Sequence, residues 1–310
     1  MAGTGILSKC GVGLNASWGA AWTAVDTLIP FSSESLEKTI AKIDDASLTG
    51  IGGMKKADAG LISLPGDLSG DLDYYNWGKV LEAALGSVAT GVYDIVDTNS
   101  KVLRLEFEKV TSRWRIGSAK VNRLVISGQK GEAVKITVGL VGDDLTRSST
   151  TFPSLSLAGS SRVLFHQGTF RFADTVDALA SGDAVGLESF ELTFERNFKT
   201  DDYTNQARTI LEPKENGFRR VTLRVKLPRY EADTFIDWKD NGTDVQADMV
   251  FTDGTKTFKI EIPQMLAFEG FNANIGGPDI VPLEGTFECY VNTDNSTMSA
   301  VTKEFRITIS

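Results

Sequence analysis

The side chains most often used in catalysis are scarce in this chain of 310 residues. His166 is the one histidine, and it lies in the segment VLFHQGTFRF, an apparent strand with no identifiable catalytic partner. Cys10 and Cys289 are the two cysteines, and no His-Asp set accompanies either of them. We therefore interpret His166 as a structural or surface residue and both cysteines as small core residues with free thiols. We expect no enzymatic activity, no cofactor and no metal site.

Carboxylates are the remaining candidates for chemistry. Asp67, Asp71 and Asp73 in the segment PGDLSGDLD resemble a loose calcium loop, but the glycine and final glutamate spacing of an EF-hand is missing. Alternating Asp and Leu fits better with a strand that has one polar face. A hydrolase with paired carboxylates is the weakest alternative, because no pair stands out among 41 acidic residues.

The overall charge argues against a protein that grips nucleic acid. Lys and Arg number 32 against 41 Asp and Glu, a formal net charge of −9, whereas phosphate binding needs a concentration of basic side chains. Hydrophobic residues make up 41% of the chain, which is enough for a packed core. The first 14 residues do not resemble a signal peptide, and no window approaches the ~20 apolar residues of a membrane span. We expect synthesis in a reducing cytoplasm and no contact with a membrane.

The elements that must position these residues are mostly strands. Apolar and polar residues alternate with period two in many segments, which indicates strands with one buried and one solvated face. The clearest segments are 103–107, 134–140, 190–194, 221–227, 258–262 and 301–309. Two helices are predicted, over Tyr74–Leu85 and Tyr230–Trp238, and each directly follows a strand. The fold class is therefore mainly β, of the sandwich or barrel type.

An internal repeat divides the chain. Residues Glu34–Ile40 match Glu188–Phe194 at an offset of 154, and Leu68 and Leu72 fall on Leu223 and Leu227 at an offset of 155. Both halves run strand, long loop, strand, helix, further strands, which indicates a duplication. We predict two similar β-sandwich or barrel domains over residues 1–145 and 185–310, each flanked by a short helix. Residues 146–184 would form connector strands or an insertion.

Two long loops occur at equivalent places in the two halves, over Asp44–Gly60 and Lys199–Gly217. Compact domains seldom keep connections beyond ~12–15 residues unless the segment binds something or is disordered. The loops carry apolar residues amid polar ones: Ile51 and Met54 in the first, and Tyr203, Ile210 and Leu211 in the second. Either they are flexible surface hairpins, or they are arms that order against a neighbouring copy of the chain.

Longer segments carry a family resemblance. The succession LNASWGAAWTAVDTLIPFSSESLEK and LISLPGDLSGDLDYYNWGKVLEAALGS, continued by KITVGLVGDD, FKIEIPQMLAFEG and LEGTFECYV, resembles the tail tube (major tail) proteins of long-tailed bacteriophages. The resemblance covers most of the chain diffusely. It implies a β-sandwich flanked by a helix, subunits that form rings, and rings that stack into a DNA-conducting tube in the virion. Some members carry the fold twice and form trimeric rings with pseudo-sixfold symmetry, whereas most have one domain and form hexamers.

The resemblance also implies roles and partners. An acidic lumen would not hold DNA back, and the alternating strands offer candidate lumen-lining residues at Glu34, Glu37, Asp67, Asp71, Asp73, Glu188, Glu191 and Glu195. Basic residues on the second half, such as Arg219, Arg220 and Arg224, either neutralise these acids or lie at a subunit junction. The two loops are candidates for contacts between stacked rings. Implied partners are further copies of the chain, a tape measure protein and DNA in the lumen, and tail terminator and distal tail proteins at the tube ends.

One binding function stays open beside the tube. A carbohydrate- or receptor-binding β-sandwich on a phage tail would stack sugars on exposed aromatic rings. The candidate rings are those of Trp18, Trp22, Trp77, Trp114 and Trp238. Because Trp77 and Trp238 lie on the apolar faces of the predicted helices, we expect both of them in a core.

Overall fold

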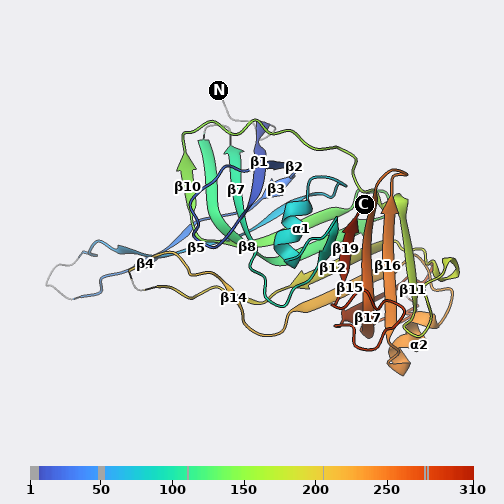
Figure 1. The fold of residues 1–310 in the computed structure, drawn as a ribbon. Coiled ribbons are helices and arrows are strands. Elements are labelled where there is room, and N and C mark those ends of the chain that lie inside the picture. The colour runs from blue at the N-terminus through green and yellow to red at the C-terminus, as the bar shows by residue number, and fades with distance from the viewer. Residues whose placement is uncertain (1–6, 48–52, 110–111, 205, 276, 278) are drawn as a thin grey trace.

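The computed structural model of the chain describes residues 7–310 except 48–52, 110–111, 205, 276 and 278. It is mainly β, as predicted, with two α-helices among the described residues. Figure 1 shows two β-rich halves side by side, with a long hairpin projecting from the first. We call the elements from β1 to β10 the first half and those from β11 to β19 the second half.

The bounds of the elements follow the chain. The first half contains β1 (Lys9–Asn15), β2 (Thr27–Ile29), β3 (Ser33–Glu34), β4 (Thr39–Ile43), β5 (Asp58–Asp71), α1 (Gly78–Leu85), β6 (Val92–Asp94), β7 (Val102–Lys109), β8 (Ser112–Gln129), β9 (Lys135–Gly142) and β10 (Leu145–Ser148). The second half contains β11 (Gly168–Asp174), β12 (Ser189–Glu195), β13 (Phe198–Lys199), β14 (Lys214–Glu215), β15 (Arg220–Leu227), α2 (Thr234–Asn241), β16 (Val245–Thr252), β17 (Thr257–Gly270), β18 (Leu283–Cys289) and β19 (Arg306–Ile309). Short 3-10 helices, η2 (Phe165–Gln167) and η3 (Ser181–Asp183), flank β11.

The two halves share one order of antiparallel pairings. In the first half the paired strands run β3–β5–β9–β8–β7–β1, and β10 pairs with the start of β8. In the second half they run β12–β15–β18–β17–β16–β11, and β19 pairs with the start of β17. The helix follows the equivalent strand in each half, β5 or β15. This shared topology is consistent with the predicted duplication.

The registers define which residues are equivalent. Leu68 and Leu223 are buried at matching places on β5 and β15, and they lie opposite Glu34 and Leu192 respectively. Glu34 is therefore the equivalent of Leu192, four residues beyond the Glu188 suggested by the sequence match. The match at an offset of 154 found the correct strands with the wrong register, because a two-residue pairing at β3 replaces the regular alternation of β12.

One sheet crosses the boundary between the halves. The C-terminal part of β8 pairs with β12 from Arg123↔Glu195 to Gln129↔Ser189. The strands β3–β5–β9–β8–β12–β15–β18–β17 thus form a continuous antiparallel array that draws equal numbers from each half. A second link joins β6 to β19. The halves are therefore bound by backbone hydrogen bonds as well as by side chains.

The halves differ in how their helices are covered. α1 buries Val80, Leu81, Ala83, Ala84 and Leu85, whereas α2 buries Phe235 alone of its residues. Both helices end at a glycine with left-handed backbone, Gly86 at φ 100° and Gly242 at φ 62°. The prediction began each helix four residues too early and ended the second three residues too early. The first helix begins late because the Asp73 carboxylate accepts the Tyr75 and Asn76 N–H groups at 2.7 and 2.6 Å and holds a turn.

The two predicted loops contain hairpins. β4 pairs with the first part of β5, and β13 pairs with β14, with a further bridge between Tyr203 and Ile210. We call residues 39–63 the first arm and residues 198–215 the second arm. Both arms leave the body between equivalent strands, β3 and β5 or β12 and β15. Residues 146–184, predicted as connector strands or an insertion, contain β11, which pairs with β16 in the sheet of the second half.

Candidate functional site

The face of the continuous sheet that points away from the core carries rows of charge. Residues paired across neighbouring strands share a face, so the registers define these rows directly. One row runs Asp67, Gly139, Arg123, Glu195, Arg220. A second runs Asp71, Lys135, Ser127, Glu191, Arg224, Thr286, Glu269. We call this surface the open face; its charges largely alternate in sign from strand to strand.

Several charges of the open face form ion pairs. Arg123 approaches Asp67 at 3.3 Å, Arg220 approaches Glu288 at 2.8 Å, and Lys226 approaches Glu188 at 3.0 Å. Because these side chains are at least one-third exposed, each pair contributes only about 0–1 kcal/mol. Among the described residues, Glu191 and Glu195 form no ion pair, so the balance of the face stays acidic. Arg220 and Arg224 pair with Glu288 and Glu284 on the neighbouring strand, and a place of these arginines at a subunit junction stays a prediction.

Five of the eight predicted lumen acids lie on this open face. Asp67, Asp71, Glu191 and Glu195 belong to the rows, and Glu37 lies beside Pro65 in the same phase as Asp67. Their common placement follows from even spacing along β5 and β12. Glu188 lies just before β12, at the end of the face, where it is paired with Lys226.

Two of the predicted acids lie elsewhere and require a correction. Glu34 is opposite Leu68, on the core side, where it forms an ion pair with Lys109. Asp73 is 2% exposed and serves the turn before α1. Glu34 and Glu37 are an odd number of residues apart, so one strand cannot place both on one face. Asp73 has the right phase, but β5 ends before it, at Asp71.

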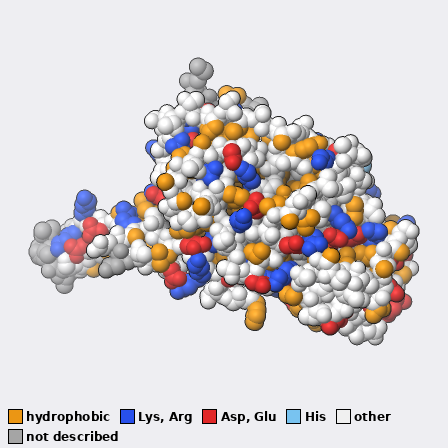
Figure 2. Space-filling model, viewed as in Figure 1, with side chains coloured by type: hydrophobic (Ala, Val, Ile, Leu, Met, Phe, Trp, Pro, Cys, Tyr) orange, Lys and Arg blue, Asp and Glu red, His pale blue; other side chains and the backbone are white. Residues whose placement is uncertain are grey.

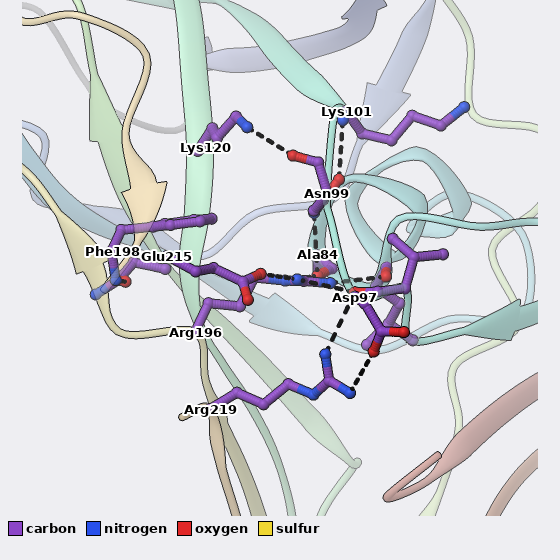
Figure 3. Close-up of polar contacts among 12 residues, drawn as sticks. Ala84, Asp97, Asn99, Lys101, Lys120, Arg196, Phe198, Glu215 and Arg219 are labelled. Atoms are coloured by element: carbon purple, nitrogen blue, oxygen red, sulfur yellow. Dashed lines mark hydrogen bonds and ion pairs between the residues drawn. The ribbon is translucent and has the colours of Figure 1, made fainter. Parts of the chain in front are cut away.

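The junction between the halves contains a fully buried arginine. Arg196, directly after β12, donates from Nε to the Ala84 carbonyl at 2.9 Å and from Nη2 to the Leu85 carbonyl at 2.8 Å. Its Nη1 also forms an ion pair with Glu215 (Figure 3). The side chain thus satisfies carbonyls at the C-terminus of α1, where the helix dipole favours a cation. Burial lowers the pKa of Arg196, which Glu215 opposes.

A buried lysine extends the same junction. Lys120 Nζ donates to the Asn99 carbonyl at 2.6 Å and lies 2.6 Å from Glu212 Oε1 in the second arm. The Asn99 amide in turn donates to the Ala83 carbonyl at 2.6 Å (Figure 3). Burial lowers the pKa of Lys120, and the Glu212 carboxylate opposes that shift. Nearby, Arg219 contacts Glu304 and Asp97, so this basic residue lies at the junction and not on the open face.

The sequence carried one signal for this junction that the prediction missed. Phe190, Leu192 and Phe194 are the buried phase of β12, and Arg196 continues that phase. When an arginine occupies a position that the alternation of a strand assigns to the core, it either lies at the edge of the core or is buried with hydrogen-bond partners, because an unpaired buried charge is costly. Sequence periodicity did not reveal Lys120 in the same way, since its neighbours on both sides are buried.

The second arm is docked on the first half. Ile62 N–H donates to the Arg208 carbonyl at 2.8 Å, and Trp18 Nε1 donates to the Ile210 carbonyl at 3.3 Å. The Tyr203 hydroxyl donates to the Ile62 carbonyl at 3.3 Å. Ile210 is buried and Leu211 is exposed. Three of the five predicted stacking residues therefore lie in an arm that contacts its own chain.

The first arm supplies the receiving side of this contact at Gly60 and Ile62 on β5, and its other strand, β4, is not docked in the same way. All five residues of β4 are exposed, and so is Met54. Figures 1 and 2 show this arm projecting from the body with charged side chains along it. Ile51 lies outside the described residues. A role of the arms between stacked rings stays a prediction.

The tryptophans offer no shared platform for a sugar. Trp77 is buried, Trp18 binds the second arm, and Trp238 packs edge-on against Phe235. Arg147 lies 4.8 Å from the Trp114 ring centroid, and Arg115 lies 4.7 Å from that of Trp22. Each of these rings thus has a neighbour within the chain, and carbohydrate binding stays a prediction.

None of the helices in the described part of the chain has the length and apolar character needed to cross a membrane. No group of three or more His, Cys, Asp or Glu side chains among the described residues is arranged to hold a metal ion.

The family model described as phage tail tube protein matches residues 5–289, nearly the whole chain. No curated protein matches the chain.

Proposed function

The chain belongs to the phage tail tube protein family, and we propose that three copies form a ring in which six similar halves surround a channel for DNA. Membership of this family makes the protein a structural component of the phage tail that assembles with itself and with other tail proteins. We propose the number of chains in each ring, the residues that line the channel and the passage of DNA through it. It rests above all on one observation: the continuous sheet ends in two edges that match the junction already present inside the chain.

The first of these edges belongs to β17. In the first half, β8 pairs with β7 along its start and with β12 along its end. In the second half, β17 pairs with β16 up to Met265, and no described strand occupies the same side of Leu266–Gly270. Unpaired strand edges readily continue a sheet into another chain. The end of β17 is thus the place where a further strand equivalent to β12 would pair.

The second edge belongs to the segment around β3, the equivalent of β12. Ser32, Ser35 and Glu37 donate their N–H groups toward β5. On the other side, where β12 pairs with β8, no described strand pairs with this segment, and the Leu36 N–H is satisfied by the Glu34 carboxylate at 3.1 Å. Repeating the β8–β12 register between chains places Glu37 opposite Leu266, Leu36 opposite Ala267 and Glu34 opposite Gly270.

Repetition of this junction determines how many chains the ring contains. If each contact between chains copies the contact between halves, the halves follow one another around the axis as equivalent units. A closed ring of six such units contains three chains, and a heterologous contact of this kind gives a ring only when its rotation closes. A hexamer of whole chains would instead contain twelve halves and would need a wider ring.

The open face is the proposed channel wall. Its opposite face forms the core, so it is the one face of the continuous sheet that remains free along all eight strands. The acids of the face are Glu37, Asp67, Asp71, Glu191, Glu195, Glu269, Glu284 and Glu288, and its basic residues are Arg123, Lys135, Arg220, Arg224 and Lys226. Duplex DNA carries a charge every ~1.7 Å, and a wall with paired bases and an excess of acids offers little counterion release to hold it. A tape measure protein would occupy the same lumen before DNA, with terminator and distal proteins at the ends.

Electron microscopy of the purified protein tests the assembly. We expect rings or tubes whose top views show six similar lobes built from three chains. A protein that stays monomeric at high concentration, in the presence of the other tail components, would contradict the proposed function.

Reversal of charge tests the channel. Glu191→Lys with Glu195→Lys breaks no ion pair among the described residues and should leave tubes intact while slowing DNA release from particles. The control is Glu231→Lys with Asp240→Lys, which reverses two exposed acids before and within α2, away from the open face, and breaks only their exposed pairs with Arg229 and Lys239. Equal release rates in the two variants would exclude this face as the channel wall.

A further inference from the structure

The two arms are equivalent in topology, and the second arm is docked against the base of the first at Gly60 and Ile62. The second arm contacts the first half through its backbone at Arg208 and Ile210 and through Glu212, which lies 2.6 Å from Lys120 Nζ. At its base, Phe198 N–H donates to Asn122 Oδ1 at 2.9 Å, and the Lys120 ammonium lies 5.6 Å from the Phe198 ring centroid. These contacts bury Ile210 to 5% exposure. The second arm thus extends from the second half and packs against the first half of the same chain.

The first arm exposes apolar side chains that an equivalent contact with another half would bury. Ile40 is 46% exposed, Ile43 57% and Met54 85%. An isolated two-stranded hairpin is at best marginally stable in water, so a hairpin with apolar side chains along it favours a partner. Figure 1 shows no other part of the chain beside the outer portion of this arm.

The second half offers a surface equivalent to the one that receives the second arm. Lys120 and Gln264 are equivalent, because each precedes a residue (Val121 or Met265) that pairs with matching positions on β9 and β18. Val176 follows β11 as Trp18 follows β1, and it is 79% exposed. Phe218, at the base of the second arm, is 99% exposed. The Gln264 carboxamide accepts hydrogen bonds from the Thr293 N–H and Oγ1 at 3.3 and 3.4 Å, so the apolar surface that stays exposed at this place is that of Val176 and Phe218.

We propose that the first arm of each subunit docks on the second half of a neighbouring subunit in the same ring, as the second arm docks on the first half of its own chain. This inference rests on the proposed ring and adds the partner of the arm. Ile40 is the equivalent of Phe198, so it lies against Gln264 of the second copy. The contact runs around the ring and not along the tube axis.

Cysteine cross-linking tests the position of the arm. One chain carries Ile40→Cys and a second carries Gln264→Cys, and mixed rings are treated with a short bis-maleimide. Both native thiols are buried, and burial raises the pKa of Cys10 and of Cys289, which keeps them unreactive. The control is Leu61→Cys with Arg208→Cys in one chain, which spans the docked second arm without joining chains.

Single rings that contain both variants should yield cross-linked dimers, and a chain that carries both cysteines should yield trimers as the largest product. Products longer than trimers that form in tubes but not in single rings would show that the arm reaches the next ring, and this would overturn the inference. Rings without any cross-link would overturn it as well. Absence of rings in wild-type protein would instead contradict the proposed function, which distinguishes the two failures.

Discussion

The two halves of the molecule share their strand order and differ in what covers them. In the first half, Arg196 caps the C-terminus of α1 and β12 pairs with the edge of β8. The second arm packs on the surface of the same half. The second half has the same helix, edge and surface, and no described part of the chain covers them in the same way. The comparison supports our proposal that the contact inside the chain is repeated between chains.

The largest expected effect concerns the covered helix of the first half. Arg196→Ala leaves Glu215 and the Ala84 and Leu85 carbonyls without their partner at a buried position. Removal of one partner from a buried ion pair costs about 3–5 kcal/mol, and chemical denaturation of the unassembled subunit should show a loss of that size. The control Arg224→Ala removes an exposed pair with Glu284 and should cost at most about 1 kcal/mol. Equal losses would mean that the junction is no tighter than the open face.

The two arms give a smaller and sharper contrast. Ile210→Ala removes a buried side chain from the docked arm and should destabilise the unassembled subunit by about 2 kcal/mol, at the low end for such a truncation. Ile40→Ala, at an exposed position of the free arm, should change the stability of the unassembled subunit by less than about 0.5 kcal/mol. Thermal or chemical unfolding measures both. A stability loss at Ile40 as large as that at Ile210 would show that the first arm is docked before assembly.

The smallest effect appears at alkaline pH. Burial, aided by Asp253, raises the pKa of Tyr74 to about 12. An unfolded tyrosine loses its proton near pH 10, so the native state keeps a proton that the unfolded state has released. The contribution of Tyr74 to stability is therefore complete below pH 10 and is lost between pH 10 and 12. Tyr74→Phe should decline less steeply in that window, and parallel unfolding curves would contradict the assignment.

Local patterns predicted the elements well and their environment less well. Alternation in segments such as 190–194 and 221–227 found β12 and β15, and glycine after an amphipathic stretch found the end of α1. The sequence did not predict which strands pair when they are far apart along the chain. The pairing of β12 with one edge of β8, for example, depends on the arrangement of the whole sheet. The odd spacing of Glu34 and Glu37 already excluded a common face. The docking of Ile210 is a tertiary contact that no local pattern carries.

Cryo-electron microscopy of an assembled tube, reconstructed without imposed rotational symmetry, tests the central claim most directly. The account predicts three chains per ring, with residues 31–37 of one chain paired along Leu266–Gly270 of the next in the register that β12 takes on β8. A ring of six chains, or a ring in which these two edges lie apart, would contradict it.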